Sequence, residues 1–110
     1  MDAASRNALA NAIDQLWARF LPEMKQRVAI LEAAAADFAA GSLGLPQQEA
    51  ANAAAHKLAG VLGTFSLTKG TVLARELEIV YSNRDGPDPE AGARLASITA
   101  ELRDIVENRR

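Results

Sequence analysis

The sequence of 110 residues contains no cysteine and a single histidine, His56. Without cysteine the chain has neither a disulfide framework nor thiolate chemistry, and one histidine does not suffice for a typical zinc site within one chain. No acidic loop spacing indicates a calcium or magnesium site either. We therefore expect no bound metal.

The chain also lacks an excess of charge of one sign and has no long apolar run. Twelve basic and fourteen acidic residues are interspersed and give a formal net charge of -2, which argues against a nucleic-acid partner. No apolar stretch is long enough to span a bilayer, and residues 1–6 do not begin a secretory signal. We expect a cytoplasmic protein that binds neither membrane nor nucleic acid.

Aromatic residues make up only 5% of the chain, whereas alanine is abundant. Alanine favours helix, and the β-branched and aromatic residues that favour strands are sparse. The length fits one compact domain, so we expect a single helical domain over residues 1–110.

Apolar residues recur at helical spacing in five segments: 9–20, 24–38, 50–65, 72–80 and 95–106. Pro22 should separate the first two, and the first stripe should face a core. Gly41 should end the second helix, residues 68–71 should form a connection or a fraying junction, and Asp88 should cap the last helix. The pattern predicts an all-α, antiparallel (up-down-up-down) four-helix bundle with an additional N-terminal helix. His56 lies on the helix expected at about residues 46–65.

Two glycines follow His56 inside that expected helix. Each glycine in a helix interior costs about 1 kcal/mol relative to alanine, so Gly60 and Gly63 need a reason. They could allow another helix of the bundle to pack closely, or they could leave room for a second protein. His56 itself could be a solvated surface residue or a reactive one.

The run from His56 to Glu78 reads HKLAGVLGTFSLTKGTVLARELE and resembles the histidine phosphotransfer (HPt) domains of bacterial multistep phosphorelays. Leu58, Gly60 and Phe65 match the family pattern around its histidine. Ala59 stands where the family usually has lysine, and Ser66 stands where it usually has glycine. Glu78 follows His56 by twenty-two residues, where such domains commonly place an acidic or amide side chain on the neighbouring helix.

The resemblance implies that His56 accepts a phosphoryl group and that Glu78 orients the imidazole. If Nδ1 donates to Glu78, Nε2 is left as the nucleophile. Taken alone, Glu78 could equally be a solvated carboxylate or an ion-pair partner of Arg75. The residues expected to face a docking partner are Lys57, Ala59, Gly60, Gly63 and Arg75.

The lysine missing at Ala59 would be expected near the phosphoryl oxygens. Lys57 projects about 100° around the helix from His56, so its side chain would have to bend back to reach them. Lys69 and Arg75 are the other candidates.

These observations together predict a phosphocarrier that moves a phosphoryl group between receiver-domain aspartates in two-component phosphorelay signalling. The expected partners are response-regulator receiver domains and a hybrid sensor histidine kinase, and we expect a monomer. No cofactor of its own is expected, since magnesium could come from the receiver. The chain has no recognisable nucleotide-binding loop, so it should not act as an ATP-dependent kinase.

The alternative is a helical adaptor or inhibitor that binds a receiver or kinase through the same surface without carrying phosphate. The sequence does not decide between a free protein and a domain of a longer one.

Overall fold

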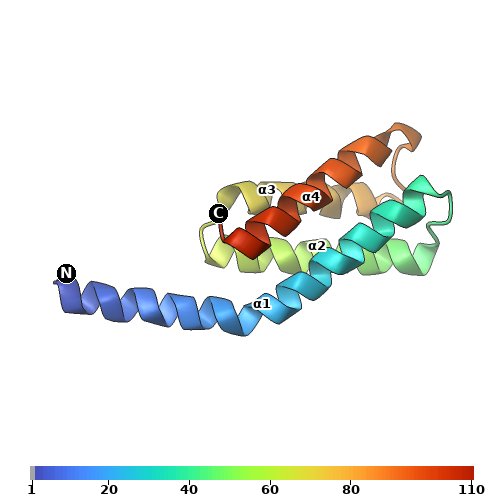
Figure 1. The fold of residues 1–110 in the computed structure, drawn as a ribbon. Helices are drawn as coiled ribbons and strands as arrows, with labels where there is room; N and C mark the ends of the chain where they lie inside the picture. The colour runs from blue at the N-terminus through green and yellow to red at the C-terminus, as the bar shows by residue number, and fades with distance from the viewer. Residues whose placement is uncertain (1) are drawn as a thin grey trace.

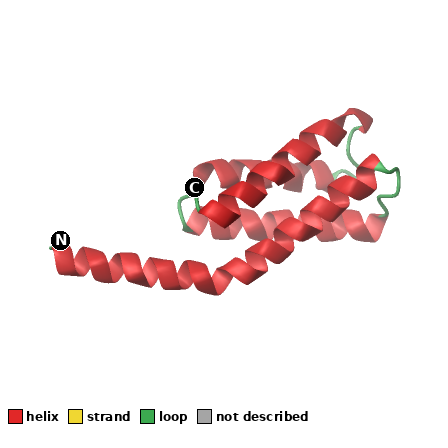
Figure 2. Cartoon of the chain, viewed as in Figure 1, coloured by secondary structure: helices red, strands yellow, loops and turns green. Residues whose placement is uncertain are grey.

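The computed structural model describes residues 2–110, and in this range the chain is helical without strands. The elements are α1 (Ala3–Ala39), α2 (Leu45–Thr64), α3 (Thr68–Ser82), the short 3-10 helix η1 (Pro89–Ala91) and α4 (Gly92–Asn108). Figure 2 shows these helices joined by short loops. Within the described residues, no helix is both long and apolar enough to cross a membrane. The expected all-α class is confirmed.

The four long helices form an antiparallel bundle in which each helix runs opposite to the one before it (Figure 1). Helix α1 packs against α2 and α4, and α3 packs against the same two helices. The order around the bundle is therefore α1, α2, α3, α4, which is the up-down-up-down arrangement predicted from the short loops.

The separate N-terminal helix was predicted wrongly, because α1 runs without interruption from Ala3 to Ala39 with Pro22 inside it. Proline removes one backbone N–H and its ring crowds the preceding turn, which bends a helix without necessarily ending it. Figure 1 shows α1 changing direction part-way along its length. The helix continues past Pro22 because Met24, Val28 and Leu31 are buried in the core.

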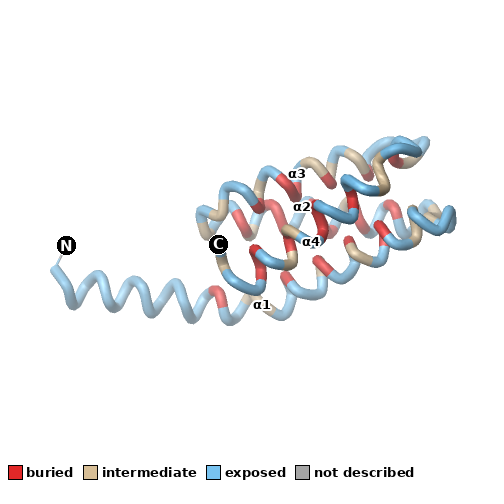
Figure 3. The backbone as a smooth tube through the Cα atoms, turned by 45° about the horizontal axis from the view of Figure 1, so that its top comes forward, coloured by how far each residue is buried: buried red, intermediate tan, exposed pale blue. Residues whose placement is uncertain are grey.

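The first half of α1 projects beyond the rest of the bundle, as Figure 3 shows, and residues 2–16 are all exposed. The predicted stripe 9–20 therefore meets the core only at its end, through Trp17 and Phe20, whereas Leu9 is 51% exposed. Asp14 pairs with Arg109 just after α4, at 2.6 Å. Packing against the core begins at Trp17, whose ring meets Phe65 edge-on with centroids 5.0 Å apart. Helix α1 is longer than its neighbours, so its first turns have nothing to pack against.

The core consists of apolar stripes from all four helices, and two ion pairs join helices outside it. Arg94 on α4 binds Glu76 on α3 through both carboxylate oxygens, at 2.8 and 2.9 Å. Arg103 on α4 binds Glu32 on α1 in the same way, at 2.7 and 2.6 Å. In each pair the guanidinium lowers the pKa of the carboxyl group. The fully buried Leu, Ile, Met, Val and Tyr side chains are Met24, Val28, Leu31, Leu58, Leu62, Leu77, Tyr81, Leu95, Ile98, Leu102 and Val106.

Residues 68–71 were expected to be a connection or a fraying junction, but they are the first turn of α3. Gly70 in this turn is buried, and a Cβ added there would lie 2.9 Å from Leu62 Cδ1 and 3.1 Å from Ile105 Cγ2. Gly70 thus lets the start of α3 approach α2 and α4 closely, so these residues are part of the packed bundle.

Helix α1 ends as predicted at Gly41, which has a positive φ of 72°. Ser42 N donates to Asp37 O at 2.8 Å, and Gly41 N donates to Phe38 O at 3.1 Å. This pair of bonds is the Schellman motif, which favours glycine at the position with positive φ.

Helix α2 ends in the same motif, but with serine in the place of glycine. Leu67 N donates to Leu62 O at 3.0 Å, and Ser66 N donates to Gly63 O at 3.1 Å. Ser66 has a φ of 58°. A side chain at such a φ costs roughly 1–2 kcal/mol, so Ser66 holds a conformation that glycine would hold with less strain.

We predict that Ser66→Gly raises the free energy of unfolding by about 1 kcal/mol, because glycine has no Cβ that clashes with the backbone in the left-handed conformation. Chemical denaturation monitored by circular dichroism measures this change. The mirror exchange Gly41→Ser is the matched control and should destabilise by a similar amount. Equal or lower stability of Ser66→Gly would contradict the argument.

Candidate functional site

His56 lies on the outer face of α2, and its side chain is 69% exposed. The run of alanines before it favours helix, and the helix turns Ala55, Leu58 and Leu62 into the core. With 3.6 residues per turn, this burial leaves His56 facing outward.

Gly60 and Gly63 lie on the same exposed face, one and two turns after His56. A Cβ at Gly60 would meet nothing within 4 Å, and one at Gly63 would meet only Thr71 Oγ1, at 3.7 Å. Neither glycine is needed for packing inside the bundle, so that interpretation is wrong. The remaining explanation of Gly60 and Gly63 is that they leave room for a second protein, and this stays a prediction.

Glu78 on α3 contacts His56 on α2 directly. His56 Nδ1 lies 2.9 Å from Glu78 Oε1, and the Glu78 side chain is 26% exposed. The second oxygen, Oε2, lies 3.9 Å from Arg75 Nη1. Glu78 therefore contacts the imidazole and the guanidinium at the same time. An ionised carboxylate only accepts hydrogen bonds, so this contact favours the imidazole tautomer with its proton on Nδ1.

Two polar residues that the sequence analysis did not single out lie one and two turns before His56. Asn52 Nδ2 donates to the main-chain oxygen of Glu78 at 2.7 Å. Gln48 is buried, and its Nε2 donates to Tyr81 O at 3.1 Å and also to Asn83 O. The four-residue spacing of Gln48, Asn52 and His56 was the available signal, because it places three polar side chains along one side of an otherwise alanine-rich helix. All three contact α3 or the residue after it.

Ala59 was expected on the docking surface, and the structure corrects this, because Ala59 is only 1% exposed. Its position on the helix falls on the same side as Gln48 and Asn52, which is the side that contacts α3. The small methyl group lets α2 and α3 pack closely at the level of the site.

The three basic candidates lie on different sides of His56. Lys57 is exposed and lies about 100° around α2 from His56, away from the side that meets α3. Lys69 points towards α4, where its Nζ lies 3.5 Å from Glu101 Oε2. Among these three, Arg75 is the one that shares a carboxylate with His56.

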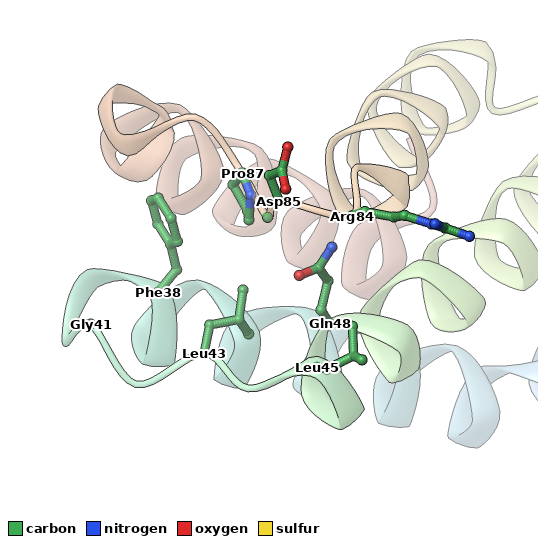
Figure 4. A pocket seen from close by; sticks show the side chains of 9 residues that line it. Phe38, Gly41, Leu43, Leu45, Gln48, Arg84, Asp85 and Pro87 are labelled. Atoms are coloured by element: carbon green, nitrogen blue, oxygen red, sulfur yellow. The ribbon is translucent and has the colours of Figure 1, made fainter.

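The site is an open surface rather than a pocket. A hollow of about 460 Å³ lies elsewhere, where the ends of α1 and α3 meet the start of α2 (Figure 4). Its lining includes Phe38, Leu43, Gln48 and Pro87, but not His56. In residues 2–110 no group of three or more His, Asp or Glu side chains is arranged to hold a metal ion.

Comparison with known proteins identifies one family. The Hpt domain model matches residues 15–109. Protein RcaC of Microchaete diplosiphon is 30% identical over 96 residues, which cover 87% of this chain and 15% of that protein. No solved structure gives a significant match. A family match over most of the chain, on a helical bundle with an exposed histidine, leads to one conclusion: the chain belongs to the Hpt domain family.

Proposed function

We propose that the protein is a phosphocarrier in which His56 accepts a phosphoryl group from an aspartyl phosphate of one receiver domain and passes it to an aspartate of another. Membership of the Hpt family implies a general function in histidine phosphotransfer within phosphorelays. The observation that carries the proposal for this chain is the exposed imidazole with Nδ1 2.9 Å from Glu78 Oε1.

The chemistry follows from that contact. With the proton on Nδ1, the lone pair of Nε2 attacks phosphorus in line with the breaking P–O bond, and the electron pair of that bond leaves with the receiver carboxylate. The product ring keeps its Nδ1 proton and carries positive charge, which the Glu78 carboxylate stabilises. Transfer to the next receiver reverses these steps. Magnesium, where it is required, is supplied by the receiver.

The surface around His56 suits close approach by a receiver. Gly60 and Gly63 leave the helix backbone uncovered on one side of the imidazole. On α3, Val72 and Ile79 are apolar and exposed, and Ile79 reaches 70%. Arg75 lies between them at i+3 from Val72, so all three share one helix face. This face offers apolar contact together with positive charge.

The finer parts of the proposal concern partners and location. We propose receiver domains and a hybrid sensor histidine kinase as partners, a monomer as the working form, and the cytoplasm as its location. The matched region is only 15% of RcaC, so the partners of RcaC do not transfer to this chain. The rival role is an adaptor that binds a receiver through the same face without taking the phosphoryl group.

The decisive experiment is transfer from radiolabelled, phosphorylated receiver domains to the wild type and to His56→Ala. We expect rapid, acid-labile labelling of the wild type and none of His56→Ala, because the chain has no other histidine. ATP alone should label neither protein. Binding without transfer, which survives His56→Ala, would instead establish the adaptor.

Replacing Glu78 tests how the imidazole is oriented. Glu78→Gln keeps an oxygen that accepts from Nδ1–H but loses the negative charge, whereas Glu78→Leu loses both. We therefore expect transfer to fall by about tenfold or more in the leucine variant and by less in the glutamine variant. Nitrogen-15 NMR of His56 should show the Nδ1–H tautomer in the wild type and a mixture in Glu78→Leu. Unchanged tautomer and rate in Glu78→Leu would reject the orienting role.

Substitutions at Gly60 test the docking surface. A small side chain there should stabilise the fold, whereas a large one should reduce phosphoryl transfer. Gly60→Ala should raise the free energy of unfolding by about 1 kcal/mol, since its Cβ points into open space and alanine is the better helix former. Gly60→Leu should keep the fold but reduce receiver affinity and transfer by about tenfold or more. Ala50→Leu, at an exposed position on another side of α2, is the matched control. Equal receiver affinity of Gly60→Leu and wild type would contradict the docking argument.

A further inference from the structure

The site lacks a cation where the family motif usually has one. A phosphoryl group on Nε2 would bring a charge of about -1.5 to -2, as phosphorylated side chains do at pH 7. In the family pattern a lysine three residues after the histidine would lie nearby, but here that position is the buried Ala59. A phosphocarrier without any cation at this point would hold that charge unpaired.

The neighbouring basic residues on α3 and α4 are mostly engaged elsewhere. Lys69 pairs with Glu101, and Arg94 pairs with Glu76, both between α3 and α4. Lys57 lies on the flank of α2 that faces away from α3. Arg75 is left as the cation on the α3 flank of His56.

Arg75 is connected to His56 through a single carboxylate. Glu78 Oε1 lies 2.9 Å from His56 Nδ1, and Glu78 Oε2 lies 3.9 Å from Arg75 Nη1. The guanidinium and the imidazole therefore lie on the two oxygens of one carboxylate, as neighbours on the same surface. The Arg75 side chain is exposed and has a long, flexible stem, so its guanidinium is free to turn from Glu78 to another anion nearby.

The ion pair that Arg75 makes in the unphosphorylated protein is easily given up. It is long at 3.9 Å, and the Arg75 side chain is 58% exposed. Exposed ion pairs contribute at most about 1 kcal/mol, whereas a guanidinium bound to phosphate makes stronger, often bidentate hydrogen bonds. A phosphoryl group on His56 would therefore compete well for Arg75.

We infer that Arg75 replaces the missing lysine by moving from Glu78 Oε2 to the phosphoryl oxygens once His56 is phosphorylated. This inference rests on the proposed function, since it needs a phosphoryl group on His56. No further bond is made or broken, because Arg75 only exchanges one anionic partner for another. Its departure leaves the full Glu78 charge facing the ring when the ring becomes positive.

The test compares Arg75→Gln and Arg75→Lys with the wild type, and uses Lys25→Gln as a control that removes an exposed positive charge from α1. Potassium phosphoramidate is the phosphoryl donor in one arm, because it modifies histidine without a partner protein. Phosphorus-31 NMR then follows the titration of the phosphoryl group, and proton–nitrogen NMR follows the Arg75 side chain. The second arm measures transfer from a phosphorylated receiver.

We expect phosphorylation to shift the Arg75 side-chain resonance and the phosphoryl group of Arg75→Gln to titrate at higher pH than that of the wild type. Transfer in Arg75→Gln should fall by about tenfold, with partial rescue in Arg75→Lys and no change in Lys25→Gln. A phosphoryl titration and transfer rate in Arg75→Gln equal to those of the wild type would overturn the inference.

The two arms keep the two hypotheses apart. Failure of every receiver to label His56 would count against the proposed function, while the phosphoramidate arm would still decide whether Arg75 contacts the phosphoryl group. A His56 that phosphoramidate does not modify would overturn the inference as well.

Discussion

The register between α2 and α3 is the constraint on which the site depends. Three side chains at four-residue spacing on α2 contact α3 or the residue that follows it: Gln48 at the main chain of Tyr81 and Asn83, Asn52 at the main chain of Glu78, and His56 at the Glu78 carboxylate. A shift of α3 by one turn would move Glu78 about 5.4 Å along the helix and out of reach of Nδ1. The main-chain contacts of Gln48 and Asn52 therefore hold the geometry that the His56–Glu78 contact needs.

Small residues decide how closely α2 approaches its neighbours and which parts of it stay open. Ala59 is buried on the side that meets α3, and Gly70 lets the first turn of α3 close onto Leu62 and Ile105. Gly60, in contrast, lies against open space. Glycine in this chain thus serves internal packing at one position and an uncovered surface at another, although the two look alike in the sequence.

The two departures from the family pattern, Ser66 and Ala59, have different physical consequences. Ser66 occupies a position with positive φ at the end of α2, which explains physically why glycine is usual there, and serine adopts the same turn at some cost. Ala59 lies at the contact between two helices, so a lysine there would have to extend from this contact to reach the phosphoryl oxygens. The first change affects stability, and the second removes a cation from α2.

The sequence by itself determined the features that depend on local periodicity. The apolar spacing predicted the helical class and the bundle, Gly41 predicted the end of α1, and the pattern around His56 singled out the histidine and the two glycines that follow it. Only the tertiary structure decided that α1 continues through Pro22, that Leu9 lies free of the core, that Ala59 is buried, and that Glu78 meets both His56 and Arg75. The reason is that helix spacing is set within a few residues of the same chain segment, whereas burial, helix length past a proline and contacts between helices are set by the neighbours each segment packs against.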